Sequence, residues 1–528
     1  TITFNQLLTY KKSFGKHNFD FLLGHENYWL QIVETDMRKK GMGILGIDEM
    51  SNLSIPVEMQ SSTDTYTKEG YFGRVNYDLD ARYNLSLSYR RDGTSRMAPD
   101  KRWGNFWSFG AGWNLAQEAF AQKDWLDELK LRASIGQTGN DLISWASDSD
   151  VDSYYAYSTH YELGYNNGDY PGVRLKELGN PDLRWETQTS TDVAVEFGVF
   201  NRLRGTIEIF NKESKDLIFG YPLPQSGGAE WINKNIGKVR NYGVEFDLKG
   251  TLMSSKDFKW SLSLNGTMLK NKIVRLPDEN RKDGIEFAHT KYEEGRSIYD
   301  FYLKEWIGVD PADGVAMYRL DAEKYPSLSD PSKPDNFVGV GKEGEAATWT
   351  KDARFAKKHF CGTAIPKIYG GFGTRAEWRG FDLEVLFAYQ LGGKTYDRGY
   401  ERLMGRKLNS GSAMHKDMYK AWKNPGDKTD VPRLDAGNAG RYDAERSDRF
   451  LISSDALMLK SINIGYTFPK MWGKKFGLEE LRLSLAAENL FLISARKGLN
   501  PMMNHSGVTA YAFYDYAKTL TSSISIKF

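Results

Sequence analysis

The chain lacks the features that mark most redox proteins, zinc proteins and nucleic-acid binders. Its 528 residues contain one cysteine, Cys361, so neither an internal disulfide nor a CxxC zinc site can form. Basic and acidic residues nearly balance, 71 against 69, which argues against nucleic acid as a partner. No stretch approaches the roughly 20 apolar residues of a spanning helix, so any membrane-spanning part must be built from strands.

Catalytic and metal-binding patterns are also missing. The seven histidines show no HExxH or paired spacing. Asp148, Asp150 and Asp152 imitate the start of a calcium loop, but Ser153 and Thr159 stand where that loop needs glycine and glutamate. No nucleophile elbow, P-loop or dinucleotide fingerprint occurs. We therefore expect no metal ion, no cofactor and no enzymatic activity.

Aromatic residues and glycine, by contrast, are abundant. Aromatic residues make up 14% of the chain, which also holds 51 glycines, yet the mean hydropathy is only -0.56. This combination is typical of a sheet with one face toward lipid and the other toward water. It predicts an all-β, antiparallel transmembrane β-barrel.

Strict alternation of apolar and polar residues supports the same fold. It recurs from one end of the sequence to the other and predicts about seventeen strands, with no competing helical periodicity. In residues 83–90 the apolar members are Tyr83, Leu85, Leu87 and Tyr89, and in residues 381–389 they are Phe381, Leu383, Val385, Phe387 and Tyr389.

The connections between the predicted strands alternate between short and long, which places them on opposite rims of a barrel. An odd number of strands places the C-terminus, with its final aromatic Phe528, on the short-turn side. Tight turns are expected at 14–17, 78–82, 201–205, 254–258, 310–314 and 379–381, and long external connections at 36–66, 141–186, 219–237, 321–366, 398–455 and 495–518.

Several long sequence segments resemble barrel segments of SusC/RagA-type TonB-dependent outer-membrane transporters, and they occur in the expected order. The resemblance runs through nearly the whole chain and covers residues 1–528 as the C-terminal part of such a barrel. The segments that show the resemblance are YFGRVNYDLDARYNLSLSYRRDGTSRM (71–97), LKLRASIGQTGN (129–140), LGNPDLRWET (178–187), NYGVEFDLKG (241–250), PKIYGGFGTRAEWRGFDLEVLFAYQLGG (366–393), INIGYTFP (462–469) and AENLFLISARKGLNP (487–501).

The resemblance implies a barrel of about 22 strands with an N-terminal plug. Neither a plug nor a TonB box is recognisable in the sequence, which begins TITFNQ without a signal peptide. We therefore expect the plug and about five strands to precede Thr1 or to belong to another chain. Unpaired edge strands at Thr3 to Tyr10 and at the C-terminus would otherwise be prone to aggregation.

Aromatic residues concentrate in two predicted external loops. Such rings can stack on sugars or clasp a peptide, but they can equally pack within the loop or against a partner lipoprotein. Both interpretations stay open for Trp145, Tyr154, Tyr155, Tyr157, Tyr161, Tyr165 and Tyr170 in the first loop and for Tyr511, Phe513, Tyr514 and Tyr516 in the last.

Charged residues on the polar strand faces are expected to line the lumen or to contact the plug. Carboxylates there can pair with arginines by charge and hydrogen bonding. A glycosidase pair is a much rarer outcome for such acids. The lumen candidates are Glu208, Arg375, Asp382, Glu384, Arg482 and Glu488.

The function that the resemblance implies is import of a nutrient, an oligosaccharide or a peptide, across the outer membrane of a Bacteroidetes-like Gram-negative bacterium. The implied partners are a SusD-like surface lipoprotein, TonB and outer-membrane lipid. A surface-exposed soluble β-protein that binds or hydrolyses glycans is the alternative, although it predicts repeats and turns of similar length. A passive porin or an adhesin barrel is a third possibility.

Overall fold

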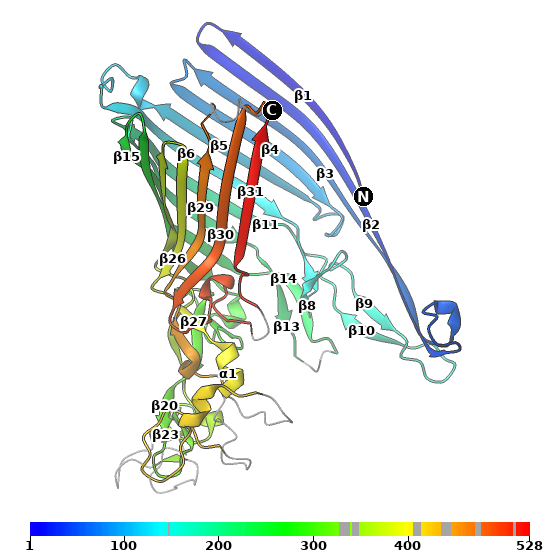
Figure 1. Cartoon of the computed structure of the whole chain (residues 1–528). Helices are drawn as coiled ribbons and strands as arrows, with labels where there is room; N and C mark the ends of the chain where they lie inside the picture. Colours follow the sequence, from blue (N-terminus) through cyan, green and yellow to red (C-terminus); the bar gives the residue numbers. More distant parts are fainter. Residues whose placement is uncertain are drawn as a thin grey trace. The chain divides into compact units, whose positions relative to one another are not determined.

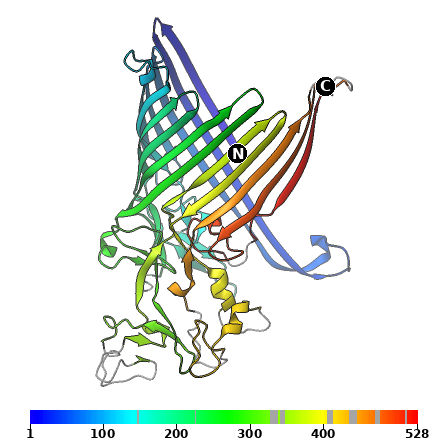
Figure 2. The ribbon, with the colours of Figure 1, turned by 60° about the vertical axis from the view of Figure 1, so that its left-hand side comes forward.

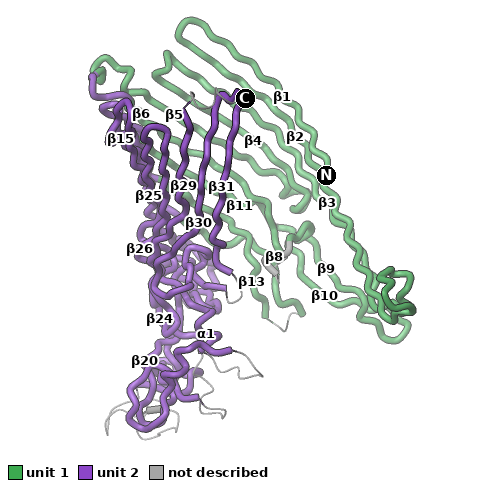
Figure 3. The backbone as a smooth tube through the Cα atoms, viewed as in Figure 1, with its two compact units in different colours: residues 1–122, 128–195, 210–240 green, residues 123–127, 196–209, 241–528 purple. Residues whose placement is uncertain are grey.

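The computed structural model contains one large antiparallel sheet and several small ones. It describes residues 1–145, 148–224, 226, 228–326, 338–339, 348–404, 413–434, 445–469, 477–510 and 514–528. Among these residues no helix is long and apolar enough to cross a membrane. The chain divides into two compact units (Figure 3): residues 1–122, 128–195 and 210–240 form unit 1, and residues 123–127, 196–209 and 241–528 form unit 2.

The large sheet has 15 strands, whose order follows the chain. β1 and β31 are its two end strands. The first eight strands along the chain are β1 (Ile2–Phe14), β2 (His17–Met42), β3 (Leu53–Leu79), β4 (Tyr83–Thr94), β5 (Trp103–Asn114), β6 (Leu126–Asn140), β11 (Glu186–Val199) and β12 (Leu203–Lys215). The other seven are β15 (Lys238–Ser254), β16 (Phe258–Arg275), β25 (Ile368–Trp378), β26 (Phe381–Leu391), β29 (Ala456–Thr467), β30 (Glu480–Ser494) and β31 (Thr519–Lys527).

The sheet therefore holds fifteen strands rather than about seventeen, and the difference arises at residues 310–314. This segment was expected to join two strands of the large sheet, but β16 pairs directly with β25. Residues 310–314 instead join β20 (Trp306–Val309) to β21 (Ala316–Arg319) in a small four-stranded sheet. The Lys351 ammonium lies 2.6 Å from Asp310 and 2.7 Å from Asp313, so an internal ion-pair cluster holds this turn.

Turn residues explain how several hairpins of the large sheet close. Gly15 follows β1 with φ +59, the position that glycine occupies in a type II′ turn. Arg379 and Gly380, between β25 and β26, have φ +46 and +91, as a type I′ turn requires. These turns fix the strand register, so the side chains of each strand alternate between the same two faces of the sheet.

The long connections differ from the expected loops at two places: residues 36–66, and the loop expected at 321–366, which runs from 276 to 367. Residues 36–66 are mostly strand, because β2 continues to Met42 and β3 begins at Leu53. The two strands pair along almost their whole length, and their hairpin extends beyond the other unit 1 strands of the large sheet in Figure 1. The other long connections of the large sheet lie at 141–185, 216–237, 276–367, 392–455 and 495–518.

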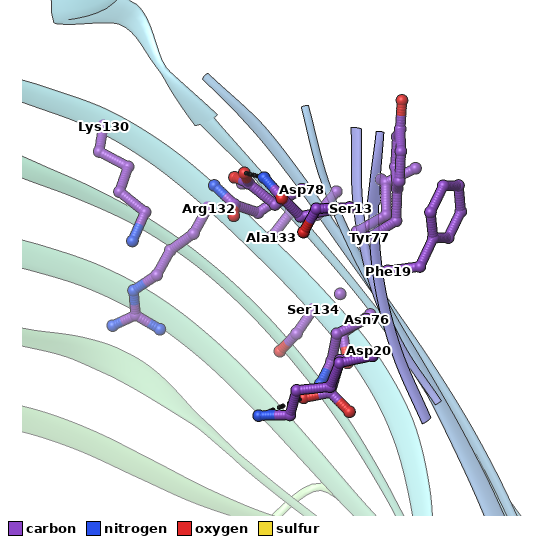
Figure 4. A pocket seen from close by; sticks show the side chains of 18 residues that line it. Ser13, Phe19, Asp20, Asn76, Tyr77, Asp78, Lys130, Arg132, Ala133 and Ser134 are labelled. Carbon is purple, nitrogen blue, oxygen red and sulfur yellow. Dashed lines mark hydrogen bonds and ion pairs between the residues drawn. The ribbon is translucent and has the colours of Figure 1, made fainter. Parts of the chain in front are cut away.

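One face of the sheet in unit 1 is apolar and open to the surroundings. Leu85, Leu87 and Phe109 lie on this face with 43%, 56% and 44% of their surfaces exposed. Figure 4 shows Phe19 and Tyr77 on the side of the strands opposite Arg132. A soluble protein would bury so continuous an apolar face, whereas a membrane protein exposes it to lipid.

Two belts of aromatic rings bound this apolar face. Tyr83 stacks on Trp113 near one rim, and Tyr71 stacks on Trp103 near the other, each pair with ring centroids 6.3 Å apart. Trp113 and Trp103 lie ten residues apart on β5, about 34 Å along a strand. With the usual strand tilt of about 40°, this separation spans about 25 Å, the height of a lipid-facing band.

Unit 2 repeats the two-faced sheet and adds a conventional core. β16, β25, β26, β29, β30 and β31 lie side by side in Figure 2. The connections after β16 and β26 pack together around Phe301, Tyr396 and Phe450, which are fully buried. Short paired strands support this core: β19 (Asp300–Lys304) with β24 (Lys358–Thr363), and β27 (Lys394–Tyr396) with β28 (Leu451–Ser453).

The apolar face generates a direct stability prediction. Leu87→Lys places a charge near the middle of the lipid-facing band and is expected to cost about 2–4 kcal/mol. Ser88→Lys, one residue away on the polar face, should cost less than about 1 kcal/mol because the new charge meets water. Urea titration of the protein in lipid vesicles measures both, and equal losses would contradict the assignment of the faces.

Candidate functional site

The polar face of unit 2 brings four of the six predicted lumen residues together. The Arg482 guanidinium donates to both carboxylate oxygens of Asp382, with Nη2 at 2.9 Å from Oδ2. Arg375 lies 3.5 Å from Glu384 on the neighbouring strand and donates to Glu377 at 2.9 Å. The strand register places all of these side chains on the face opposite the apolar one.

Glu208 and Glu488 stand elsewhere on the polar strand faces. Glu208 lies on β12, four residues from Arg204, and makes interactions of its own. Glu488 lies on β30, opposite Ser461 of β29 and Thr519 of β31. Alternation along single strands predicted these positions, but it could not show which charges become neighbours.

The polar face of unit 1 forms an open cavity of about 510 Å³ that the sequence did not single out (Figure 4). Its charges are matched: Lys11 lies 3.4 Å from Asp20, and the Asn18 amide donates to Asp78 at 3.0 Å. Lys130 and Arg132 also line it and have partners. The same period-2 pattern contained the signal for these residues, at the polar positions of β1, β2, β3 and β6.

The aromatic side chains of the first external loop fall into a packed group and an exposed group. The Arg96 guanidinium lies between the rings of Tyr66 and Tyr154, 4.9 and 4.6 Å from their centroids. The Tyr155 hydroxyl accepts a hydrogen bond from the Thr65 amide at 2.8 Å. Tyr154 and Tyr155 therefore anchor the loop to the middle of β3, at Thr65 and Tyr66.

Three other tyrosines of this loop face outward. Tyr161, Tyr165 and Tyr170 expose 58%, 49% and 79% of their surfaces. Arg174 stacks over the Tyr165 ring at 4.6 Å and holds that ring in place. Tyr157 is half-buried, and the side chain of Trp145 lies outside the described residues. The exposed rings are thus free to meet a ligand or a partner.

The last external loop is only partly described. Tyr511 and Phe513 lie outside the described residues. Tyr514 exposes 97% of its surface, and the Lys460 ammonium lies 4.8 Å from the centroid of Tyr516. Tyr514 is the most exposed aromatic side chain of the predicted set within the described residues.

A cavity of about 420 Å³ lies among the loops of unit 2, close to this segment. Its wall contains the ion pair between Arg496 and Asp397, 2.8 Å apart, and Arg496 stacks on Tyr400 with 3.4 Å to the ring centroid. Asn500 donates to Asp515 at 2.8 Å. The sequence did not predict this cavity, because its residues come from two separate loops without periodic spacing.

A buried histidine makes the packing of these loops sensitive to pH. Burial, with help from Arg446 and Arg398, lowers the pKa of His289 from 6.5 to about 4. The ring packs against Tyr396, with 4.6 Å between centroids. In the unfolded loop the His289 imidazole binds a proton below about pH 6.5, whereas in the folded loop it binds one only below about pH 4. Between these values the unfolded loop holds more protons, so acid destabilises the folded loop.

We expect hydrogen-exchange protection at the Tyr302 amide, which donates to the His289 carbonyl, to fall between pH 7.5 and pH 5 after correction for intrinsic rates. His289→Gln should make this protection nearly independent of pH. An unchanged pH dependence in the variant would place the titrating group elsewhere.

The Arg482–Asp382 pair predicts a second, small stability effect. Asp382→Asn should cost about 1 kcal/mol, because a bidentate, partly shielded ion pair loses its charge. Glu384→Gln should cost much less, since Arg375 keeps Glu377 as its partner. Urea midpoints of the whole protein measure both, and a larger loss for Glu384→Gln would reverse the ranking.

Comparison with known proteins places this two-faced sheet in a family. The family model described as TonB dependent receptor-like, beta-barrel, matches residues 3–490. TonB-dependent receptor P3 of Formosa agariphila is 29% identical over 99% of this chain and 52% of its own length. TonB-dependent receptor SusC of Bacteroides thetaiotaomicron is 26% identical over 100% of the chain and 50% of its own length.

Among solved structures, the RagAB peptide importer in its closed-closed state matches with a TM-score of 0.80 and 24% identity, over 100% of this chain and 55% of that one. That likeness supports the fold. The chain spans about half the length of the curated relatives that it matches. The chain belongs to the TonB-dependent receptor-like β-barrel family, whose members are transporters of the outer membrane and not enzymes.

Proposed function

We propose that this chain is the C-terminal barrel portion of an importer that takes a nutrient ligand across the outer membrane. One observation carries the proposal: a sheet that is apolar and belted by aromatic rings on one face carries paired charges on the other. Such a wall separates lipid from a water-filled passage. An exposed apolar face of this extent and the family match both argue against the soluble glycan-binding alternative.

The other components of the proposed importer are inferred from the family. With fifteen strands in the large sheet, a plug and about seven further strands would complete a barrel of about 22 strands. TonB would supply energy, and a SusD-like lipoprotein would cap the external mouth. The likeness to SusC and to the RagAB peptide importer supports this assignment and leaves the ligand as either an oligosaccharide or a peptide. The residues proposed to line the lumen or contact the plug are Glu208, Arg375, Asp382, Glu384, Arg482 and Glu488.

The exposed tyrosines are the proposed contacts for the lid or the ligand. Tyr161, Tyr165 and Tyr170 offer flat, partly polar surfaces at low entropic cost. Tyr514 extends the same kind of surface to the last loop. Tyr154 and Tyr155 already serve the loop's own packing, which makes them a matched structural control. No step of this mechanism makes or breaks a covalent bond.

Removal of the exposed rings tests the assignment. Tyr161→Ala/Tyr165→Ala/Tyr170→Ala should reduce the lipoprotein that co-purifies with the whole protein from outer membranes, or the uptake of its ligand, by about tenfold or more. Heat-modifiable mobility on gels should stay unchanged, because the barrel strands are untouched.

Two controls sharpen this test. Tyr155→Phe removes the hydroxyl that anchors the loop and should loosen the loop while retaining partial lipoprotein binding. Intact mass of every co-purifying band identifies the plug segment and the lipoprotein. Purification of the wild-type chain from a soluble fraction, with neither of them present, would refute the proposed function.

A further inference from the structure

An open cavity of about 450 Å³ on the polar face of unit 2 is strongly basic. It lies beside the short turns that join β11 to β12 and β15 to β16. Its charged lining residues are Arg202, Arg204, Lys249, Lys259, Arg375 and Glu384. Five cations thus share one cavity with one carboxylate.

Four of these cations lack a counter-charge among the described residues. Arg375 is held by Glu377 and Glu384. The side chains of Arg202, Arg204, Lys249 and Lys259, by contrast, form no ion pair or hydrogen bond within the part of the chain that the structure describes. Their charges are available to something outside this sheet.

The fold brings two of them side by side. The Thr251 amide donates to the Arg202 carbonyl at 2.7 Å, and Gly205 lies against Leu248. Continuing this antiparallel register places Arg204 of β12 opposite Lys249 of β15. Like charges directly opposite one another destabilise a sheet. The sheet gains no stability from this arrangement, so its packing does not explain why the two cations lie together.

The polar face of unit 1 provides the contrast. Its cavity also contains lysine and arginine, but there Lys11 is matched by Asp20 within the sheet. A wall of this fold can therefore balance its own charges. The basic cavity differs in that four of its cations lack such a partner among the described residues.

The lining of the basic cavity favours a polypeptide over a sugar. It contains no aromatic ring on which a sugar could stack, unlike the external loops. Hydroxyl groups of Thr251, Ser261 and Ser263 accompany the cations. The cations extend over β12, β15 and β16, about 10 Å across three neighbouring strands, so one small ion cannot contact them all.

We propose that the basic cavity is a docking surface for the plug that fills the lumen. The side of the plug that meets the cavity is rich in carboxylates. This inference rests on the proposed function, which places a plug inside the barrel. Chain length agrees with it, because this chain covers about half of its curated relatives. Aspartate and glutamate side chains spaced along such a surface would pair with Arg204, Lys249 and Lys259.

Zero-length cross-linking of the whole protein, purified from outer membranes, tests the proposal. A carbodiimide joins lysine amines to carboxylates that already touch them. Lys249 and Lys259 should each give cross-linked peptides with aspartate or glutamate from outside residues 1–528. Both lysines should also react with an amine-acylating reagent about tenfold more slowly than exposed Lys40, because a charge-assisted hydrogen bond must open first.

Internal controls make every outcome decisive. Lys11 should cross-link to Asp20, 3.4 Å away, which shows that the reagent reaches the polar face. With that control positive, fully reactive Lys249 and Lys259 without such cross-links would overturn the proposal. Protection of these two lysines by an oligogalacturonate, but not by maltopentaose, would instead assign the cavity to an anionic solute. Co-purification of the lipoprotein and ligand uptake are scored separately, so failure here leaves the proposed function standing.

Discussion

The structure depends on one constraint: inside a bilayer every backbone amide and carbonyl must find a hydrogen-bond partner within the protein. A sheet satisfies this demand between strands, and its period of two then sorts side chains between lipid and water. The belts around Trp113 and Trp103 and the ion pair between Arg482 and Asp382 are the two sides of that sorting. Turns such as Gly15 and Gly380 keep the sorting in register from strand to strand.

Outside the sheet the chain follows the rules of a soluble protein. Its longest connections bury a core around Phe301, Tyr396 and Phe450, close turns with ion pairs such as Lys351 with Asp310, and shield His289 from water. The loops are therefore ordered platforms rather than simple links. They present exposed tyrosines on surfaces that partly buried tyrosines hold in place, which suits recognition at the mouth of a transporter.

Much of the fold could be predicted from the sequence because period-2 alternation is a local signal. It predicted the strands around Leu87 and Phe387, and it predicted which lumen residues share a face. Local signals failed where distant segments meet. The turn at 310–314 carries Pro311 and Gly314, which suit a turn of any sheet. The pairing of β21 with β23 (Trp349–Thr350) shows that it belongs to a small sheet. The sequence did not predict the basic cavity or the Arg496–Asp397 cavity for the same reason, because neighbours on other strands and loops set the charge of each cavity.

The central claim is that one face of the sheet meets lipid and the other meets water. The most direct test measures the surroundings of a spin label on each face in the outer membrane. Nitroxide labels at Leu87→Cys and Phe109→Cys should relax with molecular oxygen, and a label at Ser88→Cys should relax with a water-soluble nickel chelate. Burial raises the pKa of the native Cys361 thiol to about 12, so that thiol reacts slowly and leaves little background. Alternation of the two relaxation agents between Leu87 and Ser88 is the predicted result; nickel relaxation at both positions would contradict a lipid-facing sheet.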